Sequence, residues 1–266
     1  MAQLEIGDAG PEVRKLQKAL RDKGFDPGLI DGEFGAGTEA ALIAFQRSAG
    51  LLADGVAGPR SLHALGLARS GNLPSAVERF SLQVVAQMFP GAPLANLREH
   101  LPVVLDAMAK AGLHDRHMLL MALCTVRAEC AGFVPIDEGL SRFNTSPRGH
   151  AFDLYDHRAD LGNRSRPDGA RFKGRGFVQL TGRHNYTVYA ERLALPLAER
   201  PERANESPVA AALLVLFLKD RELAIKSALQ EGDLRSARKL VNGGSHGLEN
   251  FSHAWRVGDL LTDDDD

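Results

Sequence analysis

The chain has 266 residues, of which 44% are hydrophobic and 25% charged, and its formal net charge is −2. These values are ordinary for a globular protein and exclude a disordered chain, a collagen-like chain and a disulfide-stapled miniprotein. The small net charge argues against nucleic acid as a partner of the whole chain. The longest apolar run, residues 209–218, is too short to cross a bilayer, so no membrane insertion is expected.

The start of the chain and its two cysteines point to the compartment in which it is made. Met1–Glu5 lacks the basic and apolar regions of a signal peptide, which predicts synthesis in a cytoplasm without an export signal. Cys124 and Cys130 are six residues apart and would lie on different faces of one helix, so a disulfide between them is geometrically poor. We therefore expect two reduced core thiols, and neither a metal nor a cofactor.

Residues 1–66 contain an internal near-repeat. The run D-G-E-F-G-A-G-T at residues 31–38 is echoed by D-G-V-A-G-P-R-S at residues 54–61. Each copy predicts a tight loop, because glycine permits positive φ, and the Thr38 or Ser61 hydroxyl is expected to cap the helix that follows. Apolar residues at helical spacing flank both loops. The sequence therefore predicts a compact three-helix unit.

The same residues carry a resemblance to a known family. The pattern V-x-x-L-Q-x-x-L is followed by D-G-x-F-G-x-x-T-x-x-A-x-x-x-F-Q-x-x-x-G-L-x-x-D-G-x-x-G. From Leu4 to about Leu65 the chain is similar to the peptidoglycan-binding domain of many cell-wall hydrolases. The resemblance implies a non-catalytic domain that targets the protein to bacterial peptidoglycan.

A change in composition near residue 70 divides the chain. Residues 69–75 combine Arg, Ser, Gly, Asn, Leu and Pro, a mixture typical of a linker. The predicted organisation is a wall-binding domain, a linker, a catalytic domain and an acidic tail, with bounds 1–68, 69–79, 80–260 and 261–266.

Apolar residues at helical spacing continue through residues 76–134. One helix is expected to run from His114 to Ala131, with Glu129 near its C-terminal end. The helix dipole disfavours a carboxylate at that end, and general acids are found in such positions. Glu129 is therefore a candidate acid.

The middle of the chain, residues 133–182, differs from its flanks. It is rich in Gly, Pro, Asn, Asp and Arg, which predicts loops and a small antiparallel sheet. Residues 139–192 carry ten lysines and arginines against five aspartates and glutamates, a net charge of +5. Such a segment is either a solvated surface or a groove for an anionic polymer, and both interpretations stay open. Further helices are expected over residues 185–195, 209–229 and 234–241.

Cleavage of a glycosidic bond requires two carboxyl groups that flank the bond. Glu129 and Glu138 are nine residues apart, which on one continuous helix means about 13–14 Å of rise and opposite faces. Gly132 and Pro135 both break helices, however, and allow the chain to turn between the two carboxylates. We therefore expect Glu129 on a helix and Glu138 on a facing loop.

Three motifs around these glutamates are similar to glycoside hydrolase family nineteen, the chitinase and phage-lysozyme family. They are E-C-A-G-F at 129–133, G-R-G-F-V-Q-L-T-G-R-H-N-Y at 174–186 and V-N-G-G-S-H-G-L at 241–248. The chain departs from the family where Cys130-Ala131 replaces the common Thr-Gly. The resemblance implies a mainly α protein, with a small three-helix wall-binding domain and a larger lysozyme-like α+β catalytic domain that has a minor antiparallel β lobe.

The resemblance also implies roles for individual residues. Glu129 would be the general acid that protonates the leaving oxygen, Glu138 the general base, and Thr181 the hydroxyl that holds the attacking water. Neutral side chains can hold a sugar without competing for the transferred proton. Tyr186 would either position the acid or belong to the core. The expected substrate-binding residues are Gln179, Asn185, Tyr186 and Asn242.

Several functions stay open at this point. A zinc-dependent wall amidase or peptidase would carry a similar wall-binding domain, but the sequence has no H-E-x-x-H motif. The changes around Glu129 would also fit a non-catalytic wall-binding protein. A chitinase would share the reaction but act on a neutral polymer.

The basic middle segment and the wall-binding domain favour peptidoglycan, whose stem peptides carry carboxylates. The expected protein is a monomeric phage or prophage endolysin made in the host cytoplasm and released to the wall through a separate membrane lesion. It would be a muramidase that cuts the β-1,4 bond between N-acetylmuramic acid and N-acetylglucosamine with inversion.

Overall fold

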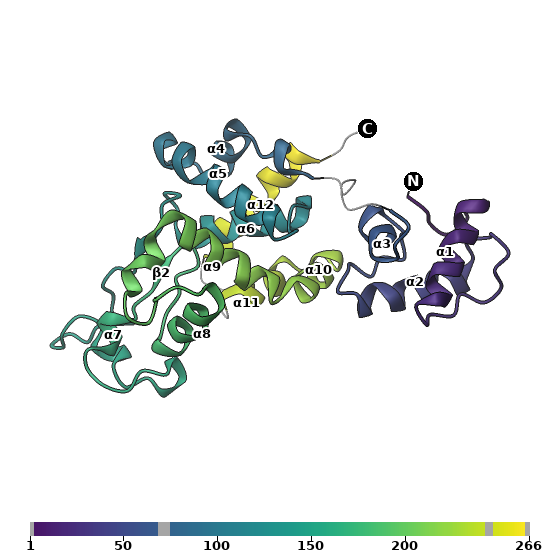
Figure 1. The fold of residues 1–266 in the computed structure, drawn as a ribbon. Coiled ribbons are helices and arrows are strands. Elements are labelled where there is room, and N and C mark those ends of the chain that lie inside the picture. Colours follow the sequence, from purple (N-terminus) through teal and green to yellow (C-terminus); the bar gives the residue numbers. More distant parts are fainter. Residues whose placement is uncertain (1–2, 69–74, 243–246, 264–266) are drawn as a thin grey trace. The chain divides into compact units, whose positions relative to one another are not determined.

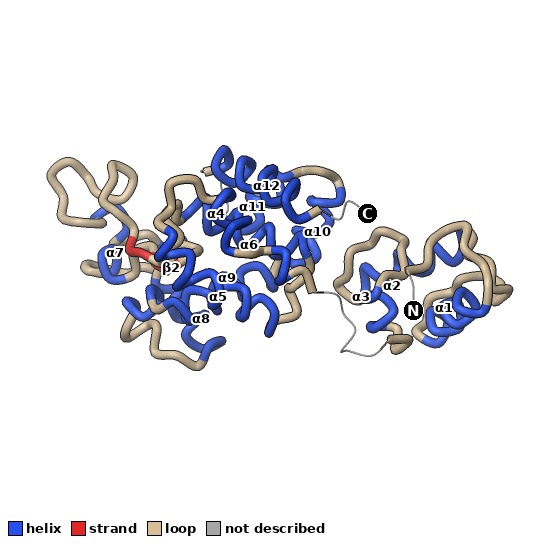
Figure 2. Tube along the Cα trace, turned by 90° about the horizontal axis from the view of Figure 1, so that it is seen from above, coloured by secondary structure: helices blue, strands red, loops and turns tan. Residues whose placement is uncertain are grey.

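The computed structural model describes residues 3–68, 75–242 and 247–263 (Figure 1). In these ranges the regular structure is helical apart from one two-stranded antiparallel sheet, visible as the short red segment in Figure 2. The predicted fold class, mainly helical with a minor antiparallel lobe, is therefore confirmed. None of the described helices is long and apolar enough to span a membrane.

The chain divides into two compact units. The first contains Met1–Ser75 together with Arg221–Ala237, and the second contains Ala76–Asp220 together with Arg238–Asp266. Two separate segments of the chain therefore form the first unit. The predicted domain boundaries assign only the N-terminal segment to it. The boundary after Ser75 lies inside the predicted linker, most of which falls outside the described residues.

The N-terminal part of the first unit is the expected three-helix arrangement. Its helices are α1 (Pro11–Asp22), α2 (Ala36–Ser48) and α3 (Pro59–Ala64). Apolar residues at i, i+3 and i+7 on α1 are fully buried, as the helical period requires. The core is formed by Val13, Leu16, Leu20, Phe34, Ala41, Leu42, Phe45, Ala57, Leu62 and Leu65.

The first Asp-Gly loop is held by a buried glutamine. The Gln17 side-chain Nε2 donates to Asp31 Oδ1 at 2.9 Å and to Thr38 Oγ1 at 3.1 Å, and Gln17 Oε1 accepts from Gly32 N at 2.9 Å. The expectation that Thr38 caps α2 is wrong. The N-cap of α2 is Gly35, and Thr38 lies inside the first turn, where its hydroxyl accepts from Gln17 instead.

The second Asp-Gly loop repeats these contacts. Gln46 Nε2 donates to Asp54 Oδ1 at 2.8 Å and to Ser61 Oγ at 3.0 Å, and Gln46 Oε1 accepts from Gly55 N at 3.1 Å. Gly58 is the N-cap of α3, so the hydroxyl of Ser61 is likewise not the cap. The sequence repeat therefore encodes one hydrogen-bond network twice, with a glutamine at the centre of each copy.

The second unit is built around one buried helix, α6 (Arg116–Glu129). All nine residues from 118 to 126 are buried, so the helix is enclosed on every side. Its neighbours are α4 (Leu82–Met88), α9 (Ser207–Lys219) and α12 (Leu248–Thr262). A Cβ added at Gly258 of α12 would lie 2.6 Å from the end of the Leu120 side chain of α6, so a larger residue there would force this side chain to shift.

A smaller lobe of loops and short elements is attached to these helices through contacts of α9 and η5 with β2. Its sheet pairs Ile136 with Gly176 and Asp137 with Arg175. The remaining elements of the second unit are η2 (Val77–Arg79), α5 (Leu94–Lys110), β1 (Ile136–Asp137), η3 (Asp153–Tyr155), η4 (Ala159–Leu161), α7 (Asp168–Arg171), β2 (Arg175–Gly176), α8 (Arg183–Leu193) and η5 (Pro201–Asn205).

Two expected helices differ from those observed. The single helix expected over residues 209–229 is two helices, α9 and α10 (Glu222–Gln230), because the chain leaves helical geometry at Arg221, where φ is −125°. Asp220 at this break is paired with Arg192 at 2.7 Å. The helix expected over 234–241 is observed as α11 (Leu234–Asn242).

Both ends of the expected catalytic domain also differ. Ala76 N donates to His114 O at 2.9 Å, so this residue of the expected linker is bonded to the second unit. At the other end, Thr262 completes α12 and Asp263 pairs with Arg116 at 3.3 Å, so the expected acidic tail begins inside a helix. Residues 264–266 lie outside the described part of the chain.

Candidate active site

Glu129 lies at the C-terminal end of α6, near which the sequence places it, and is the last residue of the helix, which ends two residues earlier than expected. Its carboxylate is ion-paired with Arg238 of α11, and the two side chains are 11% and 0% exposed, respectively. The Arg238 guanidinium also lies over the ring of Phe251, at 5.9 Å from its centre. A buried arginine thus faces the candidate acid. Sequence reasoning missed Arg238, although an arginine next to the buried Ala237 on the apolar face of a short helix is the signal that could have found it.

The chain turns sharply after Glu129, which the helix breakers led us to expect. Cys130 is the C-cap that follows α6, and its Sγ donates to Gly176 O of β2 at 3.3 Å. Burial, together with the negative charge of Glu129, raises the pKa of the Cys130 thiol to about 12, so it stays protonated. Phe133 then adopts a left-handed φ of 53° and packs against Phe177, with ring centres 5.9 Å apart. These contacts fix the segment that connects the two candidate carboxylates.

Both cysteines are free and buried, as expected.

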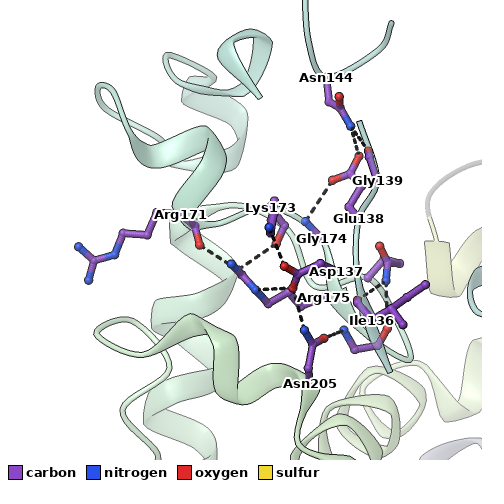
Figure 3. Close-up of polar contacts among 12 residues, drawn as sticks. Ile136, Asp137, Glu138, Gly139, Asn144, Arg171, Lys173, Gly174, Arg175 and Asn205 are labelled. Atoms are coloured by element: carbon purple, nitrogen blue, oxygen red, sulfur yellow. Dashed lines mark hydrogen bonds and ion pairs between the residues drawn. The ribbon is translucent and has the colours of Figure 1, made fainter. Parts of the chain in front are cut away.

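Glu138 follows β1 directly and is held by three donors, of which Figure 3 shows Asn144 and Gly174. Its Oε1 accepts from Asn144 Nδ2 and from the Tyr155 hydroxyl, each at 2.9 Å, and its Oε2 accepts from Gly174 N at 3.1 Å. Because an ionised carboxylate only accepts hydrogen bonds, these three donors fix the direction of the carboxylate. The geometry fits a group that accepts a proton.

The two side chains that hold Glu138 were not predicted from the sequence. Asn144 is fully buried on the loop after Glu138, and Tyr155 ends η3. Burial and the hydrogen bond to Glu138 raise the pKa of Tyr155 to about 12, so its hydroxyl stays a donor at neutral pH. Asn144 and Tyr155 lie six and seventeen positions after Glu138, in segments without a periodic sequence pattern. The sequence therefore gives no signal that they contact Glu138.

Asp137 precedes Glu138 and points to the other face of the strand, into a charged cluster (Figure 3). Its carboxylate lies 2.6 Å from Lys173 Nζ and 3.0 Å from Arg175 Nε, and it accepts from Asn205 Nδ2 at 2.7 Å. Burial acts to raise the pKa of Asp137, but the hydrogen bonds from Lys173 and Asn205 outweigh it and the pKa is lowered. Asp137 therefore anchors the strand that carries Glu138.

Gly174 brings Gln179 close to Glu138. A Cβ at Gly174 would lie 2.8 Å from Gln179 Oε1 and 3.2 Å from Glu138 Oε2, so both polar groups border the space that the glycine leaves. Gln179 has a left-handed φ of 51°, and its Nε2 donates to Ile136 O and Gly176 O, each at 3.1 Å. The expected sugar-binding residue Gln179 thus lies beside the expected base.

Thr181 and Asn185 continue the same loop and enter α8. The Thr181 hydroxyl donates to Gln179 O, and Asn185 Nδ2 donates to Thr181 O, both at 2.8 Å. Both side chains are partly exposed, so water and sugar can reach them. Their expected roles stay predictions. Asn242 ends α11, but its side chain lies outside the described residues.

Tyr186 is completely buried in the lobe. Its hydroxyl donates to Lys173 O and accepts from Arg175 Nη1, both at 3.0 Å. Of its two expected roles, these contacts favour the core. Binding of substrate by Tyr186 stays a prediction.

A buried ion pair ties the lobe together on the side of α7 and α8. Asp168 is 2% exposed and binds the Arg183 guanidinium with both carboxylate oxygens, one of them at 2.9 Å from Nε. It also accepts from Arg164 N at 2.8 Å. Bidentate pairs of this kind are directional as well as strong, so Asp168 fixes the start of α8.

Replacing Asp168 by asparagine is expected to lower the free energy of unfolding by about 3 kcal/mol, because the Arg183 charge loses its buried partner. Urea unfolding measures this. Asp160→Asn is the matched control, because its pair with Arg158 is exposed and worth well under about 1 kcal/mol. Equal losses in the two variants would contradict the assignment.

The difference in unfolding free energy between the wild type and Asp168→Asn is expected to depend on pH. Burial acts to raise the pKa of Asp168, but the hydrogen bonds from Arg183 and Arg164 N outweigh it, and the pKa lies below its usual 3.8. The stabilisation by Asp168 is therefore complete above this value and is lost as the pH falls through the lowered pKa. The stabilities of the wild type and Asp168→Asn are expected to converge in strong acid.

Within residues 3–68, 75–242 and 247–263, His, Cys, Asp and Glu form no group of three or more that could hold a metal ion.

Residues 9–65 match the family model described as a putative peptidoglycan binding domain. This segment covers the three helices of the first unit and both Asp-Gly loops. The expected wall-binding domain is therefore confirmed.

Two curated proteins and one solved structure are similar to the chain. A glycosyl hydrolase family 19 domain-containing protein of Haemophilus influenzae is 24% identical over 59% of this chain and 85% of its own length. N-acetylmuramoyl-L-alanine amidase CwlM of Mycobacterium tuberculosis is 46% identical, but over 27% of this chain and 19% of its own length. Chitinase C of Streptomyces griseus HUT6037 aligns with a TM-score of 0.47 at 15% identity, over 69% of this chain and 76% of that chain.

The matched segments cover different fractions of the related proteins. The chain spans less than a fifth of the amidase but most of the family 19 protein. It thus combines a peptidoglycan-binding domain with homology to family 19 glycosyl hydrolases.

Proposed function

We propose that the protein is an endolysin that hydrolyses the β-1,4 bond between N-acetylmuramic acid and N-acetylglucosamine by inverting acid–base catalysis. One observation carries the proposal: two glutamates of the second unit have different hydrogen-bond partners and different burial. Glu129 ends a buried helix against Arg238, whereas Glu138 accepts three hydrogen bonds beside the partly exposed Gln179. Two carboxyl groups with different surroundings are what acid and base roles require.

In this mechanism Glu129 protonates the leaving oxygen while Glu138 removes a proton from water on the opposite face of the sugar. Asn144, Tyr155 and Gly174 N occupy defined positions on the Glu138 carboxylate, and its remaining lone pairs are available to the water. Arg238 fixes the position of the Glu129 carboxylate through their ion pair. Gln179 and Thr181 are proposed to orient the sugar and the water.

The peptidoglycan-binding domain at residues 9–65 supports peptidoglycan as the polymer. The net charge of +5 over residues 139–192 supports an anionic glycan over neutral chitin. Release to the wall through a membrane lesion and a monomeric state are further parts of this proposal.

The test is digestion of purified sacculi, followed by mass spectrometry and NMR of the first products. We expect fragments that end in reducing N-acetylmuramic acid, initially as the α-anomer, because water attacks opposite the β-linked leaving group. Inversion requires space for this water, roughly 6.5–9.5 Å between the carboxyl groups against about 5–5.5 Å for retention.

Any other first product would contradict one specific part of the proposal. An initial β-anomer would show retention and would recast Glu138 as a nucleophile. Reducing N-acetylglucosamine would identify the other β-1,4 bond. Free stem peptides with intact glycan strands would identify an amidase and overturn the glycosidase assignment.

A further inference from the structure

The loop that follows Glu138, residues 139–143, exposes apolar side chains to solvent. Phe143 is 71% exposed and Leu140 is 64% exposed. The Arg142 guanidinium lies over the Phe143 ring, 4.8 Å from its centre. Neither Phe143 nor Leu140 contributes to the buried core of the second unit, so packing does not explain their presence.

This loop, which we name the base loop, is fixed by one buried side chain. Asn144 donates to Gly139 O at 2.8 Å and accepts from Ser141 N at 2.9 Å, which closes the loop at both ends. The same amide donates to Glu138 Oε1 at 2.9 Å. The base loop and the candidate base therefore share an anchor, and the exposed ring of Phe143 is attached to a fixed backbone beside the carboxylate.

A fixed loop loses little conformational entropy when it binds a ligand. An aromatic ring covers the apolar C–H face of a sugar, and it offers a large contact area with few rotatable bonds. A guanidinium stacked on that ring keeps its N–H edge available for a carboxylate. Within the described residues, no acidic side chain forms an ion pair with Arg142.

We propose that the base loop binds the glycan beside the bond to be cut, with Phe143 stacked on a sugar ring and Arg142 paired with a stem-peptide carboxylate. This inference rests on the proposed function and adds a determinant of substrate class to it. It explains how the site distinguishes peptidoglycan from neutral chitin, because Arg142 has a partner on peptidoglycan alone.

The experiment compares Phe143→Ala and Arg142→Gln in the full-length protein on three substrates: intact sacculi, glycan strands stripped of peptides, and chitooligosaccharides. Phe143→Ala is expected to lower kcat/KM roughly tenfold on every glycan that the wild type cleaves, mainly through KM. Arg142→Gln is expected to lower it by a similar factor on sacculi, by less on stripped strands, which keep only the lactyl carboxylate, and to leave any cleavage of the neutral chitooligosaccharides unchanged.

Matched controls separate binding from folding. Leu260→Ala removes an equally exposed apolar side chain from α12, and Arg256→Gln removes a charge from the exposed face of the same helix, outside the basic segment 139–192. Leu260→Ala and Arg256→Gln are expected to keep wild-type kcat/KM, and the control and loop variants are expected to keep the wild-type Tm, since the side chains are exposed.

The outcomes distinguish this inference from the proposed function. Cleavage of no glycan by the wild type would overturn the proposed function. Unchanged kinetics of both loop variants with an active wild type would overturn the base-loop inference alone. Sedimentation with phosphatidylglycerol vesicles that depends on Phe143, with unchanged hydrolysis, would also overturn it and would assign the loop to a lipid surface.

Discussion

Glu129→Gln is expected to lower hydrolysis of soluble glycan fragments roughly a hundredfold or more, because an amide cannot donate the proton that the leaving oxygen needs. The loss depends on the leaving group. On an aryl glycoside whose leaving group has a low pKa, protonation is no longer required, and most of the activity is expected to return. This rescue is the signature of a general acid, which a merely structural residue would not give.

The ion pair with Arg238 adds a structural consequence. Glutamine keeps an acceptor for the guanidinium but removes the negative charge that faces a fully buried cation, so the Tm is expected to fall. Circular dichroism and thermal unfolding therefore accompany the assay, which is run well below the lowered Tm. Glu231→Gln, on the exposed C-cap of α10, is the control that should change neither quantity. Near-normal activity of folded Glu129→Gln would contradict the assignment.

The helices and the position of Glu129 follow from local patterns. The apolar period and the breakers after residue 129 define α6 well enough that the observed helix, Arg116–Glu129, lies within the expected one. Asp115 caps it by accepting from Met118 N at 3.0 Å. Such signals lie within a few residues of the feature that they determine, so one sequence is sufficient to read them.

The surroundings of the two glutamates could not be predicted in this way. Arg238 reaches Glu129 across 109 positions, and Tyr155 reaches Glu138 across seventeen. These contacts depend on how helices and loops pack, and a single arginine or tyrosine in a helix or loop is compatible with many partners. The break at Arg221 is a related case, because charged residues on both sides of it are compatible with a continuous helix.

The glutamine contacts of the first unit show an intermediate case. The D-G-x-x-G repeat is obvious in the sequence, and it predicts two equivalent loops. That Gln17 and Gln46 hold these loops was not predicted, because the two glutamines lie outside the repeat, 15 and 9 positions before the glycines that they contact. A repeat identifies equivalent positions, whereas the bonding partners are visible only in the fold.

Glu138→Gln is expected to reduce activity by a factor of about a hundred or more, because an amide cannot accept a proton from the attacking water. The surrounding donors make the substitution informative. Asn144 and Tyr155 donate to one carboxylate oxygen and Gly174 N to the other, so the amide nitrogen of glutamine must face a donor in either orientation. At least one hydrogen bond is lost, and a lower Tm is expected.

The role of Glu138 can be separated from this structural effect by its chemistry. Unlike Glu129→Gln, the Glu138→Gln variant is expected to stay inactive on the aryl glycoside, because activation of water is still missing. In Glu138→Ala, added azide is expected to restore turnover, since it is a nucleophile that needs no base, and the product should be the α-glycosyl azide. A β-glycosyl azide would indicate that azide attacks a covalent glycosyl-enzyme intermediate. That result would contradict direct displacement of the leaving group by water. A folded Glu138 variant with normal activity would show that another group activates the water, and Glu129 would then have to act with a different partner.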